Sequence, residues 1–164
     1  MTDPRQPFPD AARDFDFLHG SWRVRHRRRA QWLAGNEDWT EFDGTCVCQP
    51  MLGGLGNVDD NWLELPGGAY RAVTLRAFDP GAGRWSIWWL DSRHPAQLDV
   101  PVVGGFDDGI GRFFADDLYG GRPIRIRFLW SAITGTSAEW RQAFSLDGGA
   151  TWETNWEMRF TRAT

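Results

Sequence analysis

Residues 138–160 read AEWRQAF (138–144), SLDGGATW (145–152) and ETNWEMRF (153–160), and this stretch decides the fold class. Large apolar residues alternate with charged ones in both flanking segments, which is the period-two pattern of a half-buried β-strand. The middle segment is rich in Asp and Gly, which favour turns. The sequence therefore predicts a β-hairpin. Its apolar side carries Trp140, Phe144, Trp156, Met158 and Phe160, and its polar side carries Glu139, Arg141, Glu153, Glu157 and Arg159.

Similar segments separated by turn residues recur along the chain. We expect strands at about 21–32, 39–49, 57–65, 70–78, 84–91, 102–106, 111–116 and 123–130, followed by the two arms of the hairpin. Most of the connections are short, and no long helix is indicated. This spacing predicts an all-β fold, an antiparallel up-and-down β-barrel of about ten strands, with a two-sheet β-sandwich as the alternative. We expect the last arm to pair with the strand that contains Trp22 and so close the barrel.

The chain of 164 residues is most simply a single domain. Eleven Trp, eleven Phe and nineteen Gly favour β structure with tight turns. Residues 1–14 contain Pro4, Pro7 and Pro9 and are expected to form a flexible N-terminal arm, with one helical turn beginning at Asp10, so that the barrel domain spans 15–164. The net charge of −4 argues against general nucleic-acid binding.

The two cysteines, Cys46 and Cys48, lie two residues apart on an expected strand. Their side chains would be roughly 7 Å apart, too far for an unstrained disulfide, so buried free thiols are predicted. The histidines lack a metal-binding spacing, and no metal site is expected. No apolar run approaches the roughly 20 residues of a membrane span, and no signal peptide is evident. A cytoplasmic protein without a membrane partner is therefore expected.

Arg23, Arg25, Arg27 and Arg29 occupy alternate positions and would share one face of the first strand. We interpret this face as a solvated outer surface paired with acidic residues of a neighbouring strand. A patch that binds phosphate or an anionic partner is the alternative.

Residues 15–22 read FDFLHGSW, and this F-D-F-L-x-G-x-W pattern resembles a bacterial lipocalin-like family, of calycin type and unknown function. The segments LGGLGNVDD (52–60) and WSIWWLD (85–91) are also similar to members of that family, and the resemblance extends from Phe15 to Arg162. It implies a barrel in which Gly20 lets the chain turn into the first strand. It also implies that Trp22 lies across the closed end.

The turn of the hairpin matches the Asp-box pattern S-x-D-x-G-x-T-W of sialidase propellers. The matching residues are Ser145, Asp147, Gly149, Thr151 and Trp152. Asp147 is expected to accept backbone hydrogen bonds across the turn, with Trp152 packed beneath it. A single copy cannot build a propeller, which needs repeated blades. We therefore interpret the Asp-box as structural and infer no sialidase activity.

The leading functional hypothesis is that a small apolar or aromatic ligand binds inside the barrel, because barrels of this size can hold one small ligand. Strand alternation predicts the lining residues, among which His26, Arg28 and Gln142 would orient the ligand and Arg28 could meet a carboxylate. The predicted lining comprises Trp22, Val24, His26, Arg28, Ile126, Phe128, Trp130, Trp140, Gln142, Phe144, Trp156 and Met158.

Three other functions stay open at this point. An enzyme could use the same cavity, with Asp59, Asp60 or Asp91 and His26 as acid–base groups. A heme-binding barrel could use His26 or His94, although no other cofactor is indicated. A scaffold or interaction protein could have an interior filled by its aromatic residues. Binding is favoured over catalysis, and the sequence decides neither the ligand nor the oligomeric state, a homodimer included.

Overall fold

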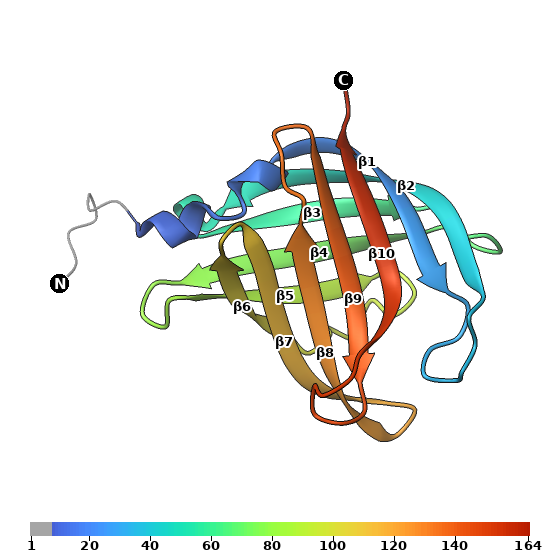
Figure 1. The fold of residues 1–164 in the computed structure, drawn as a ribbon. Coiled ribbons are helices and arrows are strands. Elements are labelled where there is room, and N and C mark those ends of the chain that lie inside the picture. Colours follow the sequence, from blue (N-terminus) through green and yellow to red (C-terminus); the bar gives the residue numbers. More distant parts are fainter. Residues whose placement is uncertain (1–7) are drawn as a thin grey trace.

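The computed structural model describes residues 8–164 and is a closed antiparallel β-barrel of ten strands in the order β1-β10-β9-β8-β7-β6-β5-β4-β3-β2 (Figure 1). Each strand pairs with its neighbours in sequence, and β1 pairs with β10, so the topology is up-and-down as predicted and the sandwich alternative is excluded. The strands are β1 Gly20–Arg29, β2 Trp39–Met51, β3 Gly56–Leu63, β4 Tyr70–Asp79, β5 Arg84–Asp91, β6 Val102–Asp107, β7 Ile110–Tyr119, β8 Arg122–Ser131, β9 Ser137–Ser145 and β10 Glu153–Arg162.

The predicted hairpin is formed by β9 and β10, and its second arm closes the barrel against β1. The register places Val24 opposite Phe160, His26 opposite Met158 and Arg28 opposite Trp156. The pairing of β9 with β10 shifts between Thr154 and Trp156, where the ladder contains a bulge. Because of this extra residue, Asn155 is buried completely although it directly precedes the inward-facing Trp156.

The first strand ends at Arg29, three residues earlier than expected. The amide of Ala30 donates a hydrogen bond to the carbonyl of Asp38, which closes the connection to β2. Trp32 therefore lies in this connection, where its ring contacts Phe144 at 5.2 Å between centroids and Tyr119 at 5.8 Å. The side chain expected at the end of β1 instead packs against residues of β7 and β9.

Two 3₁₀ turns precede the barrel, η1 (Asp10–Arg13) and η2 (Asp16–Leu18), and they lie against one end of it (Figure 1). Ala12 in η1 is buried, and the indole N–H of Trp85 donates a hydrogen bond to the Ala11 carbonyl. Within the expected N-terminal arm, η1 thus packs on the barrel through Ala12, and the flexibility of the arm stays a prediction. Residues 1–7 of that arm lie outside the described residues.

Phe15 closes this end of the barrel. Its ring is completely buried and contacts Trp85 and Phe106, each at 4.9 Å and edge-to-face. Trp22, which the family resemblance places across the closed end, is also buried, and its indole N–H donates to the Leu18 carbonyl. The closed end is thus a cluster of aromatic rings that includes both residues, with η2 covering Trp22.

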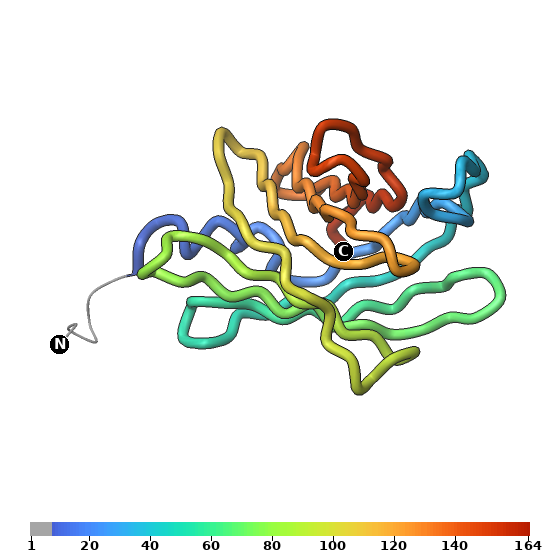
Figure 2. The backbone as a smooth tube through the Cα atoms, turned by 90° about the horizontal axis from the view of Figure 1, so that it is seen from below, coloured from blue at the N-terminus to red at the C-terminus, as the bar shows by residue number. Residues whose placement is uncertain are grey.

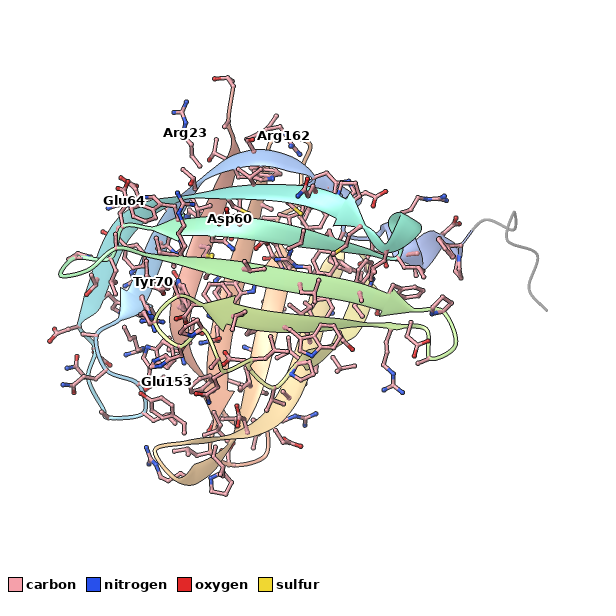
Figure 3. All side chains as sticks on the ribbon, turned by 180° about the vertical axis from the view of Figure 1, so that it is seen from behind. Arg23, Asp60, Glu64, Tyr70, Glu153 and Arg162 are labelled. Atoms are coloured by element: carbon pink, nitrogen blue, oxygen red, sulfur yellow. The ribbon has the colours of Figure 1, made fainter. Side chains whose placement is uncertain are left out.

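Arg23, Arg25 and Arg27 of β1 lie on the outside of the barrel. Arg25 pairs with Asp43 at 3.0 Å and Arg27 with Glu157 at 3.6 Å, both across neighbouring strands. Figure 3 shows Arg23 pointing away from the barrel. The interpretation as a solvated outer face paired with acidic residues is confirmed for Arg25 and Arg27.

Cys46 and Cys48 are buried free thiols, as predicted. Burial raises the pKa of Cys48 to about 12 and that of Cys46 well above its ordinary value. Both thiols are therefore protonated at neutral pH and are poor nucleophiles.

Candidate functional site

The barrel encloses a cavity of about 500 Å³, so the interior is not filled by side chains. The backbone that surrounds it is seen from below in Figure 2. One wall is aromatic and comes from β8, β9 and β10, with Phe128, Trp140 and Trp156 as its main rings. The opposite wall comes from β3, β4 and β5 and is largely polar. The polar side chains there are Asp59, Asn61, Thr74, Arg76 and Asp91.

Most of the predicted lining residues do border the cavity. These are Arg28, Ile126, Phe128, Trp130, Trp140, Gln142, Phe144, Trp156 and Met158. Trp22, Val24 and His26 do not, so their prediction as cavity lining is wrong. Each of the three is buried. Trp22 lies under η2, and the ring of His26 is covered by Trp156. Whether the bordering residues bind a ligand stays a prediction.

The rings of the aromatic wall contact each other edge to face. Trp140 and Trp156 have centroids 5.4 Å apart at 90°, and Phe128 and Trp140 are 5.0 Å apart at 75°. Trp89 of β5 meets Trp156 at 5.7 Å, which links this wall to the polar side. Each edge-to-face pair fixes the orientation of its partner. The wall is therefore a rigid surface for another apolar or aromatic group.

His26 supports this wall from behind. Its Nδ1 accepts a hydrogen bond from the Trp156 indole N–H at 3.0 Å, and its ring stacks on Phe42 at 4.5 Å. Burial lowers the pKa of His26 from 6.5 to about 3, the charge of Arg28 adds to this, and Asp43 partly opposes it. His26 is therefore neutral at physiological pH. Because Nδ1 is the acceptor, the proton is on Nε2.

The polar wall contains a buried ion pair between Asp59 and Arg76, with Oδ2 and Nη1 2.7 Å apart. The other carboxylate oxygen of Asp59 accepts from the Asn61 amide and from the Thr74 backbone N–H. Arg76 Nη1 also donates to Asn57 Oδ1 at 2.9 Å, whereas its Nε–H has no partner among the described residues. This network neutralises the charges on the wall, so the wall presents polar groups without a net charge.

A second ion pair lies on β5 and the loop after it. Arg93 donates to both carboxylate oxygens of Asp91, at 3.2 and 3.0 Å, and its guanidinium lies 3.8 Å from the ring centroid of Tyr70. Burial acts to raise the pKa of Asp91, but the hydrogen bonds from Arg93 and Trp89 outweigh it and lower the pKa on balance. Arg28 borders the same part of the cavity and lies between Trp32 and Trp156.

Of the residues considered for acid–base catalysis, Asp59 and Asp91 border the cavity, whereas Asp60 and His26 do not. Asp60 lies on the outer surface of β3, where it pairs with Arg71 at 3.5 Å (Figure 3). His26 does not border the cavity, and Asp59 and Asp91 are each engaged by an arginine. Of the two histidines considered for heme, only His94 borders the cavity.

Residues 145–152, which match the Asp-box pattern, form the turn between β9 and β10 and are not among the residues that border the cavity. Asp147 accepts hydrogen bonds from the Ser145 hydroxyl at 2.7 Å and from the Thr151 backbone N–H and hydroxyl at 2.8 and 2.6 Å. The bonds from Ser145 and Thr151 lower the pKa of Asp147 to about 2. The Gly149 backbone N–H donates to the Ser145 hydroxyl, and the Trp152 ring lies near Phe114. These bonds fix the turn and therefore the register of the hairpin.

Sequence reasoning missed most of the polar wall. Asn57, Asp59 and Asn61 alternate along β3, and this polar period-two pattern was the available signal for an inward polar face. Thr74 and Arg76 alternate in the same way along β4. The burial of Arg76 could not be inferred from its own strand, because its acidic partner, Asp59, lies on β3.

Neither a metal cluster nor a membrane-spanning helix is evident in the described part of the chain. Within residues 8–164, no group of three or more His, Cys, Asp or Glu side chains is placed to hold a metal ion. No helix in the same range is long and apolar enough to cross a membrane.

No family model and no curated protein matches this chain. Several solved structures are similar to it in fold. The S-type phycobiliprotein lyase CPES from Guillardia theta has a TM-score of 0.58 and 11% identity, covering 92% of this chain and 90% of its own. The structure of EF1p2_mFAP2b bound to DFHBI has a TM-score of 0.51 and 12% identity, covering 94% and 100%. A de novo designed fluorescence-activating β-barrel has a TM-score of 0.50 and 16% identity, covering 95% and 100%. These similarities, all below 25% identity, show a shared barrel fold.

Proposed function

We propose that this protein binds one small, mostly apolar or aromatic ligand inside the barrel. The observation that carries the proposal is the rigid aromatic wall of Phe128, Trp140 and Trp156 beside an open cavity of about 500 Å³. Ligand cavities are commonly about 300–1,000 Å³, apolar over much of their surface, and equipped with a few fixed polar groups. The polar wall supplies such groups opposite the rings.

The structural neighbours support this proposal in a general way. One is described as bound to DFHBI, another as a fluorescence-activating barrel, and the third as a phycobiliprotein lyase. Barrels of this shape have thus been associated with small molecules in proteins of very different sequence. The identity of the ligand does not transfer from them.

The test uses the neutral fluorescent probe N-phenyl-1-naphthylamine, whose emission rises in apolar surroundings. Ile126→Trp puts a bulky ring on a side chain that borders the cavity, whereas Arg125→Trp puts the same ring on the adjacent residue of β8, which does not border it. We expect saturable binding to the wild type and to Arg125→Trp, and at least about tenfold weaker binding to Ile126→Trp. Absence of saturable binding to the wild type, or equal binding to both variants, would refute the proposal.

A further inference from the structure

Arg28 differs from the other arginines that border the cavity. Arg76 is paired with Asp59 at 2.7 Å and Arg93 with Asp91 at 3.0 Å. Arg28 forms no ion pair with any residue of the described range 8–164. Its guanidinium instead lies 4.8 Å from the ring centroid of Trp32 and 4.7 Å from that of Trp156. Among the described residues, Arg28 is therefore a cavity cation that two aromatic faces hold in place and that no carboxylate neutralises.

The surroundings of Arg28 disfavour its charge. Burial lowers its pKa and the charge of Arg93 adds to this effect, while Tyr70 and Asp91 oppose it. Asp91 is already engaged by Arg93 and by the indole N–H of Trp89. The Tyr70 hydroxyl lies beside Arg28, but it is uncharged and has no hydrogen-bond partner among residues 8–164. An arginine stays protonated even so, and no carboxylate of residues 8–164 offsets the cost of withdrawing its charge from water.

Two further carboxylates border the cavity, and neither forms an ion pair with Arg28. Asp99 is exposed in the segment between β5 and β6, where water screens its charge. Asp117 of β7 is half-buried and accepts a hydrogen bond from the Leu118 backbone N–H. Arg28 therefore keeps its positive charge next to Trp156, the residue that joins both walls of the cavity.

We infer that the ligand is an aromatic anion whose acidic group, a carboxylate or its equivalent, binds to Arg28 while its ring lies on the wall of Trp140 and Trp156. This inference rests on the proposed function and specifies the chemical class of the ligand. A guanidinium offers two parallel N–H donors that match a carboxylate, and such charge-assisted bonds are roughly twice as strong as neutral ones. Stacking between Trp32 and Trp156 limits the rotation of Arg28, so little freedom is lost on binding.

The test compares two ligands of equal shape, 2-naphthoate and 2-naphthamide, as competitors that displace N-phenyl-1-naphthylamine. We expect the wild type to bind the anion about tenfold more tightly than the amide, which corresponds to about 1.4 kcal/mol. Arg28→Gln should reduce this preference to less than about threefold, because it removes the charge and keeps a polar side chain. Arg23→Gln, which removes a charge on the outer face of the same strand, is the matched control and should keep the full preference.

The outcomes separate the two proposals. If the wild type binds both competitors equally, or if Arg28→Gln keeps the preference for the anion, the inference about Arg28 is wrong while the cavity still binds aromatic ligands. If neither competitor nor the probe binds, the proposed function itself fails. Binding of 2-naphthamide by Arg28→Gln reports that the variant is folded. Should that variant not fold, Arg28→Lys is the second test. Lysine keeps the charge but lacks the paired N–H donors of a guanidinium, so this variant is expected to keep only part of the preference for 2-naphthoate.

Discussion

His26 is expected to make this protein sensitive to mild acid. The perturbation is a change from about pH 7.5 to about pH 5, applied to the wild type and to His26→Gln, whose side chain does not titrate. In the folded protein the pKa of His26 is lowered to about 3 from its ordinary 6.5, chiefly by burial. Between these two values the unfolded chain binds a proton that the folded chain excludes. The free energy of unfolding therefore falls as the pH falls from about 6.5 towards 3.

The size of the effect follows from the position of pH 5 relative to the ordinary value of 6.5. One pH unit corresponds to about 1.36 kcal/mol, so the loss of stability at about pH 5 is about 2 kcal/mol. This loss of stability changes little if the pKa of His26 in the folded protein is about 2 or about 4 rather than about 3, because pH 5 lies above all three values. Further acidification towards the folded pKa would bring the loss to roughly 5 kcal/mol.

The assay is urea unfolding followed by tryptophan fluorescence at both pH values. Any cost of replacing His26 by Gln is common to the two conditions, so the difference between wild type and variant across pH isolates the titration. His19→Gln is the matched control, because His19 lies outside the barrel wall and is only partly buried. Equal pH dependence in the wild type and in His26→Gln would refute the reasoning. So would a titration of His26 near 6.5, observed by NMR in the folded protein.

Three further predictions concern other parts of the fold. Hydrogen bonds within the turn lower the pKa of Asp147 to about 2. The contribution of Asp147 to stability is therefore present above about pH 4 and is lost as the pH falls through about 2. A carbon-13 NMR titration that finds an ordinary pKa of 3.8 for Asp147 would contradict this prediction. Asp59→Asn leaves Arg76 buried without its counter-charge and should lower the free energy of unfolding by about 3–5 kcal/mol in urea titrations, whereas an unchanged midpoint would show that the pair adds nothing. Gly104→Ala would place a Cβ 1.9 Å from the Arg112 carbonyl oxygen, whereas a Cβ at Gly105 would meet nothing within 4 Å. Thermal unfolding should therefore show a free energy of unfolding lower by at least about 2 kcal/mol for Gly104→Ala and little change for the control Gly105→Ala. Equal melting temperatures for the two variants would show that the strand adjusts.

The arrangement of strands was predictable because it depends on local pattern. Inward and outward side chains alternate along any strand, so the sequence of β9 and β10 assigns Trp140 and Trp156 to the interior without knowledge of the partners. Short turns between such segments leave few topologies other than an up-and-down barrel. The main errors in the strands, the end of β1 and the place of Trp32, concern boundaries, where the pattern is weakest.

The candidate site was predictable only in part, because its chemistry depends on contacts between distant segments. Alternation places His26 on the inner face, but the indole of Trp156, on another strand, covers it and separates it from the cavity. The bulge turns Asn155 inward against the alternation. Arg76 requires Asp59 as its partner before its charge can be assigned a place in the interior.

Strand period and turn chemistry act over a few residues, so the sequence alone predicted the strands and the aromatic interior and favoured a closed barrel over a sandwich. Which inward residues border open space, and which charges are compensated, became known only from the folded barrel. Those properties depend on the distances between side chains from different strands. The same alternation that directs Arg28 inward on β1 cannot reveal that it remains without a carboxylate partner in the described structure. That unpaired charge is a property of the assembled barrel.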